Sequence, residues 1–126
     1  MNPTLEDGDI LSIDKNYQKI DRGDIVIIKR DPDCFVKRVI AVPGDELSIV
    51  GDYIYINGEK TEETGGIDPS IDIRKDYPLR LKSGEYFVMG DNRANSWDSR
   101  SQSFGTVMED EIFALVLKKK NPEESE

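Results

Sequence analysis

The chain has 126 residues, 34% of them charged, with a formal net charge of −9, one cysteine and no histidine. That length suits a single domain. The acidic balance, with no basic stripe, excludes a nucleic-acid-binding protein, because such proteins present clustered lysine and arginine to phosphate. The lack of histidine excludes serine–histidine and cysteine–histidine mechanisms and histidine-ligated zinc, so we expect no metal and no cofactor.

The printed residues offer no segment suited to spanning a bilayer. No apolar run approaches the roughly 20 residues that a membrane-spanning helix needs, so we expect this polypeptide to be soluble. The single cysteine, Cys34, has no partner for an intrachain disulfide and lies in an apolar run, where we expect a buried free thiol. Cysteine usage therefore does not identify the redox compartment.

Short apolar runs separated by turn-forming residues predict a mainly β protein. The expected strands cover residues 10–13, 25–28, 34–42, 47–50, 53–56, 86–89 and 112–117. The last run also fits a helix by its periodicity, and we predict a strand from its place among strands. Gly51-Asp52 and Asn57-Gly58 are expected to close two hairpins with two-residue turns.

The remaining segments carry weaker local signals. Over residues 61–82 the periodicity fades, and we expect a long surface connection with one edge strand at residues 71–74. Residues 119–126 form a charged tail that we expect to be disordered, which leaves residues 1–118 as the folded domain.

Residues 90–100 are almost all turn formers and hydrogen-bonding side chains, and they follow directly on an apolar strand. Loops on such rigid scaffolds often carry catalytic and binding groups. If the segment is extended, Ser96, Asp98 and Arg100 point to one side, with Trp97 and Ser99 on the other. Asp98 and Arg100 can then brace the loop, while Ser96 can orient a neighbour. The alternative is a solvated surface turn whose exposed ion pair has little energetic value.

Lys37 is the unusual residue of the third expected strand. Alternation places it on one face with Phe35, Val39 and Ala41, all of them apolar. Burial there disfavours the charged amine and lowers its pKa from about 10.4 towards the range in which a neutral amine accepts a proton. The alternative is a lysine at a strand edge whose amine reaches water past its apolar stem. Lys37 is therefore a candidate general base, with both interpretations open.

Four segments resemble signature boxes of the type I signal peptidases, which are serine–lysine proteases. Residues 90–100, Gly-Asp-Asn-Arg-Ala-Asn-Ser-Trp-Asp-Ser-Arg, closely resemble the last box. Residues 36–45, Val-Lys-Arg-Val-Ile-Ala-Val-Pro-Gly-Asp, are similar to the box of the general-base lysine, with Lys37 in its place. Residues 22–26 resemble a structural box, and residues 1–5, Met-Asn-Pro-Thr-Leu, match part of the first box. The boxes stand in the family's order and span most of the chain.

The resemblance implies a coiled antiparallel sheet that closes on itself, with the catalytic groups on one edge. In the family's mechanism Lys37 would be the general base, Ser96 would orient its amine, and the Asp98–Arg100 pair would fix the loop that carries Ser96. Positions near the family's pockets for the small residues of an A-x-A cleavage site are held by Met1, Leu5, Cys34, Phe35 and Val36.

The first box is incomplete in the printed sequence. Family members read Ser-Met-x-Pro-Thr-Leu there, and Met1 stands one residue after the serine that acts as nucleophile. The resemblance implies a membrane-anchored parent, with its catalytic domain on the extracytoplasmic side, that removes signal peptides from exported proteins. We expect the printed residues to be a trimmed, inactive fragment of it.

Two alternatives come from other functional classes. A natural homologue without the nucleophile would bind signal peptides or partner proteins with the same cleft. A self-cleaving repressor of the serine–lysine kind would need a basic DNA-binding segment, and nothing basic of that kind occurs in this sequence.

Overall fold

The computed structural model describes residues 10–64, 74, 76–93 and 96–120. In this part of the chain all paired strands are antiparallel, and they form a six-stranded sheet of order β1-β10-β2-β3-β8-β9 and a four-stranded sheet of order β6-β5-β4-β7. The strands are β1 Ile10–Asp14, β2 Ile25–Arg30, β3 Asp33–Ala41, β4 Glu46–Val50, β5 Tyr53–Ile56, β6 Glu59–Thr64, β7 Leu79–Arg80, β8 Glu85–Met89, β9 Val107–Met108 and β10 Ile112–Lys120. One 3₁₀ turn, η2 Glu109–Glu111, precedes β10. The expected mainly β, antiparallel fold is confirmed.

The two predicted hairpin turns are confirmed. Val50 pairs with Tyr53 across Gly51-Asp52, and Ile56 pairs with Glu59 across Asn57-Gly58. Asn57 and Gly58 both have positive φ angles, 53° and 85°, which is the backbone that a type I′ hairpin turn requires. This geometry fixes the register of β6 against β5.

The boundaries of several strands differ from expectation. Residues 61–64 belong to β6, and residues 118–120 belong to β10, because pairing with a neighbouring strand orders segments that have little apolar periodicity of their own. Of the edge strand expected at residues 71–74, Arg74 lies outside any strand and the other three positions lie outside the described residues. The two-residue strands β7 and β9 are too short to leave a periodic signal.

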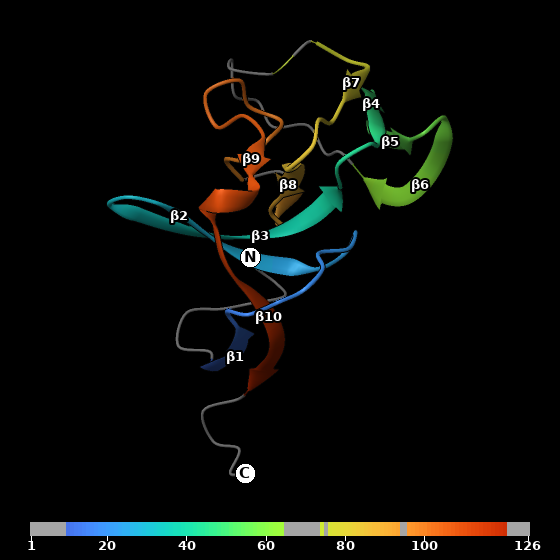
Figure 1. Ribbon diagram of the computed structural model, residues 1–126. Coiled ribbons are helices and arrows are strands. Elements are labelled where there is room, and N and C mark those ends of the chain that lie inside the picture. The colour runs from blue at the N-terminus through green and yellow to red at the C-terminus, as the bar shows by residue number, and fades with distance from the viewer. Residues whose placement is uncertain (1–9, 65–73, 75, 94–95, 121–126) are drawn as a thin grey trace.

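Strand β3 carries the chain from one sheet to the other (Figure 1). A register shift lies between Val39 and Ala41. Val39 belongs to the core cluster of the six-stranded sheet, whereas Ile40 and Ala41 belong to the cluster that packs beneath the four-stranded sheet. Alternation had predicted Ala41 on the same face as Lys37, and this is wrong. The irregularity in register turns the strand at this point and puts Ala41 on the other face.

Cys34 is exposed, so the expectation of a buried thiol is wrong. It pairs with Lys29 beside the turn that joins β2 and β3, one residue from the start of β3. In the part of the chain that the structure describes, no side chain covers Cys34, and the apolar run in the sequence does not reveal that. In the described part of the chain, no helix is long and apolar enough to cross a membrane.

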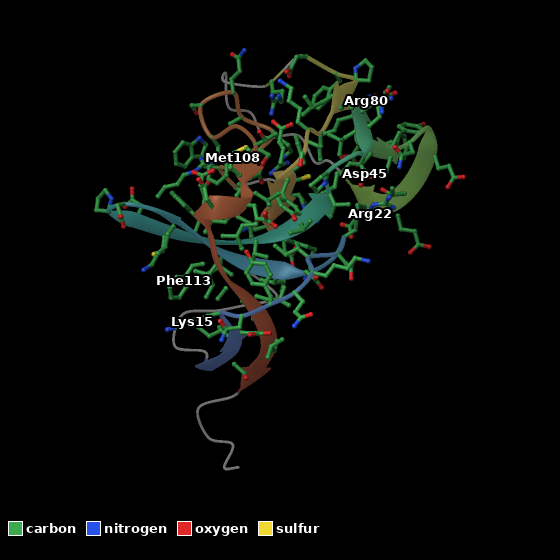
Figure 2. All side chains as sticks on the ribbon, viewed as in Figure 1. Lys15, Arg22, Asp45, Arg80, Met108 and Phe113 are labelled. Atoms are coloured by element: carbon green, nitrogen blue, oxygen red, sulfur yellow. The ribbon has the colours of Figure 1, made fainter. Side chains whose placement is uncertain are left out.

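Asp45, at the start of the four-stranded sheet, joins it to the six-stranded sheet. Asp45 is 5% exposed, and its carboxylate accepts two hydrogen bonds of 2.9 Å from the Arg22 guanidinium, which comes from the loop before β2. Figure 2 shows Arg22 and Asp45 side by side at this junction. The same carboxylate accepts bonds from the Val42 N–H at 3.0 Å and the Asn57 amide at 3.1 Å. Three chain segments are thus held by one buried charge.

Burial by itself would raise the pKa of Asp45, but the hydrogen bonds from Arg22, the Val42 N–H and Asn57 together lower it below the ordinary value of 3.8. A carboxylate whose pKa is lower in the folded state contributes stability above its unfolded pKa and loses it as the pH falls. The contribution of Asp45 is therefore complete at neutral pH.

We predict that Asp45→Asn lowers the free energy of unfolding at pH 7 by about 1–3 kcal/mol, measured by urea denaturation, because the charge-assisted bonds to Arg22 are lost. The matched control is Glu46→Gln at the residue after Asp45, which removes an exposed ion pair between Glu46 and Arg80. Its unfolding free energy should change by less than about 0.5 kcal/mol. The difference between Asp45→Asn and the parent should shrink as the pH falls below 3.8. Equal losses in both variants would contradict the role given to Asp45.

Candidate active site

The Lys37 amine and the Ser96 hydroxyl meet on the inner face of the six-stranded sheet. Lys37 Nζ lies 3.1 Å from Ser96 Oγ, so a strand residue and a loop residue 59 positions apart share a hydrogen bond. Burial lowers the pKa of Lys37 below its ordinary 10.5; the Asp98 carboxylate partly opposes this, and the Arg100 guanidinium adds to it. Since desolvation is the largest cause, the neutral amine is favoured here more than in water.

The loop leaves β8 at Gly90, and the missing side chain there makes room for this contact. A Cβ added at Gly90 would overlap Ser96 Oγ, and it would lie 2.8 Å from Ser96 Cβ and 3.6 Å from Lys37 Nζ. Gly90 has an ordinary negative φ, so the position selects glycine for space and not for backbone conformation. The close approach of Lys37 and Ser96 therefore depends on a glycine at the end of β8.

Asp98 and Arg100 form a buried pair that holds the loop. Arg100 donates from Nε and one terminal nitrogen to the two Asp98 oxygens, both at 2.9 Å, and the side chains are 9% and 0% exposed. Asp98 also accepts the Gly90 N–H at 3.0 Å. The predicted pair is present, and the alternative of an exposed pair is wrong, because the loop folds back over β8 instead of projecting into solvent.

Ser99 takes a place that the sequence did not assign to it. The segment is a turn and not an extended strand, so the alternation that had put Ser99 on the side opposite Ser96 does not apply. Its N–H donates to the Val88 carbonyl at 3.1 Å and its hydroxyl accepts the Val88 N–H at 3.0 Å. Ser99 thus completes the hydrogen bonding of β8 where a neighbouring strand would otherwise pair.

A second set of contacts fixes the start of the loop. Arg38, next to Lys37 but on the other face of β3, donates two bonds of 2.8 Å to the Asp91 carboxylate and one to the Gly23 carbonyl. Arg93 donates to the Gly90 carbonyl and to Glu63 of β6, both at 2.8 Å. Arg93 thus ties the turn to its own backbone. The contacts of Arg38 and Glu63 are long-range and have no local sequence signal.

Three aromatic rings stand on the Lys37 side of the sheet. Phe35 lies 5.7 Å from Trp97 and 5.3 Å from Phe104, and the Trp97 and Phe104 rings are 5.0 Å apart, all edge to face. Trp97 is 49% exposed and donates its indole N–H to Ser103 Oγ at 3.0 Å. Phe104 lies outside the four sequence boxes, so the sequence analysis did not select it. Its position as an aromatic residue four places after the loop of residues 90–100 is the signal that could have found it.

The expected substrate-binding residues on β3 do not all lie on one face of the strand. Phe35 shares the face of Lys37, whereas the strand register puts Cys34 and Val36 on the opposite face. Met1 and Leu5 lie outside the described residues. Among the residues that are described, no group of three or more acidic or cysteine side chains is placed to hold a metal ion.

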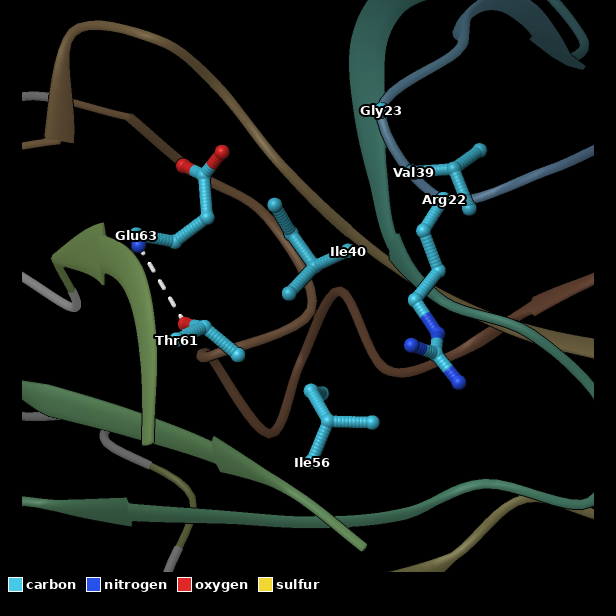
Figure 3. Close-up of a pocket in the computed structure, with 7 residues that line it drawn as sticks. All are labelled: Arg22, Gly23, Val39, Ile40, Ile56, Thr61 and Glu63. Atoms are coloured by element: carbon cyan, nitrogen blue, oxygen red, sulfur yellow. Dashed lines mark hydrogen bonds between the residues drawn. The ribbon is translucent and has the colours of Figure 1, made fainter. Parts of the chain in front are cut away.

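A cavity of about 230 Å³ opens between β3 and the β5–β6 hairpin (Figure 3), and neither Lys37 nor Ser96 is among its lining residues. Ile40 and Ile56 form its apolar wall, and Arg22 and Glu63 stand on opposite sides of it. Both charges are already engaged, Arg22 by Asp45 and Glu63 by Arg93. The lining residues are Arg22, Gly23, Val39, Ile40, Ile56, Thr61 and Glu63.

Known proteins resemble this chain along most of its length. The family described as signal peptidase, peptidase S26, matches residues 1–117. "Signal peptidase I U" of Bacillus subtilis is 39% identical over 125 residues, which cover 90% of this chain and 66% of that protein. "Signal peptidase I" of Bacillus amyloliquefaciens is 40% identical over 125 residues, which cover 89% of this chain and 64% of that protein. The chain thus spans slightly less than two thirds of the length of these curated relatives.

The fold has a solved counterpart. The crystal structure of a signal peptidase I from Enterococcus faecalis superposes with a TM-score of 0.62 at 29% sequence identity, covering 80% of this chain and 98% of that one. The agreement extends over nearly the whole of the other chain, so it concerns the architecture and not an isolated hairpin.

We predict that Gly90→Ala destabilises the protein by about 1–3 kcal/mol in urea denaturation, because its methyl group overlaps the Ser96 side chain. Adding Ser96→Gly to the same chain removes the overlapping atoms and should restore most of the lost stability. The single Ser96→Gly chain is the control. If Ser96→Gly fails to compensate, the close approach described for these two residues is wrong.

Proposed function

The chain belongs to the signal peptidase family, peptidase S26, and from this membership we propose that the natural protein is a serine endopeptidase that removes signal peptides from exported proteins. Lys37 is its general base. The observation that carries the proposal is the 3.1 Å contact of Lys37 Nζ with Ser96 Oγ at a partly buried amine whose pKa is lowered. Such an amine is the base that a peptidase without histidine requires.

In the proposed mechanism a serine hydroxyl attacks the scissile carbonyl and its proton passes to the neutral Lys37 amine. The same amine then returns the proton to the leaving nitrogen as the peptide bond breaks. Ser96 Oγ accepts one hydrogen bond from Nζ and so leaves the lone pair of the neutral amine free to face the serine. The buried Asp98–Arg100 pair keeps Ser96 at that distance.

The nucleophile of this mechanism is not among the 126 printed residues. In the family's first box the serine stands directly before the methionine, which is Met1 here. We propose that the natural polypeptide supplies a serine at that position and a membrane anchor before it, with the catalytic domain on the extracytoplasmic side. On this proposal the printed residues alone do not hydrolyse peptides.

The proposed substrate contacts follow the faces of β3. Phe35, on the Lys37 side, would contact a small substrate residue next to the scissile bond. Cys34 and Val36, on the other face, would contact alternate residues of an extended peptide at this end of the strand. Met1 and Leu5 complete the proposed set by their positions in the first box.

We predict that the chain extended by a serine directly before Met1 cleaves a synthetic peptide containing an apolar segment followed by Ala-x-Ala, measured by mass spectrometry of the products. An alanine at the added position is the matched control and should give no product. Lys37→Met in the serine-extended chain should lower kcat/KM by about 10²–10⁴-fold or more, because a general base is lost. Full activity of the Lys37→Met chain would reject Lys37 as the base. Binding of the peptide without cleavage would instead favour a binding module that lacks the nucleophile.

We predict an acid limb in the pH profile of kcat/KM for the serine-extended chain. The reactive amine is neutral, so the rate should fall as the pH drops below the pKa of Lys37. Because burial lowers that pKa, the inflection should lie below the ordinary lysine value of 10.5. An inflection at or above 10.5, or a rate that is independent of pH on the acid side, would contradict a desolvated lysine base.

A further inference from the structure

Phe104 covers one side of the Lys37 amine. It is 3% exposed, and its ring centroid lies 5.9 Å from Lys37 Nζ. Phe35, two residues before Lys37 on the same face of β3, packs against the ring edge to face at 5.3 Å. The ring therefore takes the place of water on this side of the amine.

The backbone that carries Phe104 is not held by a strand. Residues 102–106 form turns and irregular chain between the loop and β9. Arg30, the last residue of β2, donates to the Phe104 carbonyl at 2.6 Å and to the Thr106 carbonyl at 3.0 Å. The Gly105 N–H also donates to the Ser101 carbonyl at 3.0 Å, and the Thr106 hydroxyl donates to Glu85 at 2.6 Å. The Arg30 guanidinium also stacks on the Phe104 ring, 4.5 Å from its centroid. Arg30 is thus the side chain that contacts both the backbone and the ring of Phe104.

Arg30 is itself fixed by Glu111. Two Arg30 nitrogens contact the two Glu111 oxygens at 2.7 and 3.2 Å, and the side chains are 25% and 27% exposed. Glu111 also accepts the Met108 N–H at 2.9 Å. Burial by itself would raise the pKa of Glu111, but the bonds from Arg30 and the Met108 N–H lower it, so the pair stays charged at neutral pH. The guanidinium is consequently held in one orientation.

We propose that Arg30 is a positioning residue of the Lys37 site, which acts through Phe104 by holding the ring against the amine and keeping water from that side. Arg30 does not contact Lys37 or Ser96 in the bonds that the structure shows. Its importance for catalysis rests on the proposed function of Lys37, whereas its effect on the amine does not.

Two opposite effects of the ring on Lys37 have to be weighed. A ring face near an ammonium stabilises the charged form, but at 5.9 Å the contact is at the outer limit of about 6 Å for this interaction. Desolvation acts the other way and is the largest cause of the lowered pKa of Lys37. The charged groups that face the amine from the loop are Asp98 and Arg100, and both remain in place when the ring is released. Release of Phe104 should therefore raise the pKa of Lys37.

The test is an NMR titration of ¹³C-labelled lysine side chains in the full 126-residue chain, with the Lys37 signal assigned by its loss in Lys37→Met. The variants are Arg30→Gln, Arg30→Lys and Phe104→Leu, and the control is Arg80→Gln, which removes a pair on the four-stranded sheet. We expect an upward shift of the Lys37 pKa in Phe104→Leu and Arg30→Gln. Arg30→Lys keeps a positive charge but loses the planar fork, so it should show most of the shift. Arg80→Gln should show none.

The variants separate positioning from direct charge repulsion. A shift in Arg30→Gln without one in Arg30→Lys and Phe104→Leu would mean that the charge of Arg30 acts on Lys37 directly, which overturns the proposal. An unchanged or lowered pKa in Phe104→Leu would overturn it as well. Phe104→Leu keeps the Arg30–Glu111 pair and an apolar side chain, so it tests the proposal even if an Arg30 variant fails to fold.

A second readout links the amine to the proposed function. In the serine-extended chain, Arg30→Gln should move the acid limb of kcat/KM to higher pH and leave the rate above that limb nearly unchanged. A titration shift without any movement of the pH profile would retain the positioning role of Arg30 and reject Lys37 as the base.

Discussion

The site depends on one buried carboxylate. Asp98 has no exposed surface, and it holds the Gly90 N–H and the Arg100 guanidinium at the same time. A charge buried in this way is stable only while its partners remain, so breaking the pair costs far more than an exposed ion pair contributes. The pair thus anchors the loop after β8 two residues from Ser96, whose Oγ lies 3.1 Å from the Lys37 amine. The chemistry of Lys37 is in this sense a consequence of Asp98.

The two sheets supply the frame on which this loop rests. β3 carries Lys37 in the six-stranded sheet and then turns at the bulge into the core beneath the four-stranded sheet. Asp45 joins the two sheets through Arg22 and Asn57, and Glu63 of β6 reaches the loop through Arg93. Movement of one sheet against the other would thus disturb the loop.

Local sequence signals were sufficient for elements that are defined by their own residues. The β-branched run of β2 and the Asn-Gly turn before β6 identify their structures directly, and alternation placed Lys37 and Phe35 on one face. Contacts between distant segments left no such signal. The fold of the loop over β8 through Ser99, the exposure of Cys34 and the hold of Arg30 on Phe104 depend on which strands become neighbours. No local periodicity reports that, and the family resemblance covered the boxes but not Arg30 or Phe104.

The central claim is that Lys37 is the base of a serine–lysine pair. The most direct measurement is a crystal structure of the natural polypeptide that includes the position before Met1. The account predicts a serine there, with its Oγ within about 2.6–3.2 Å of Lys37 Nζ and Ser96 still bound to the same amine. A different residue at that position, or a serine whose hydroxyl lies out of reach of the Lys37 amine, would contradict it.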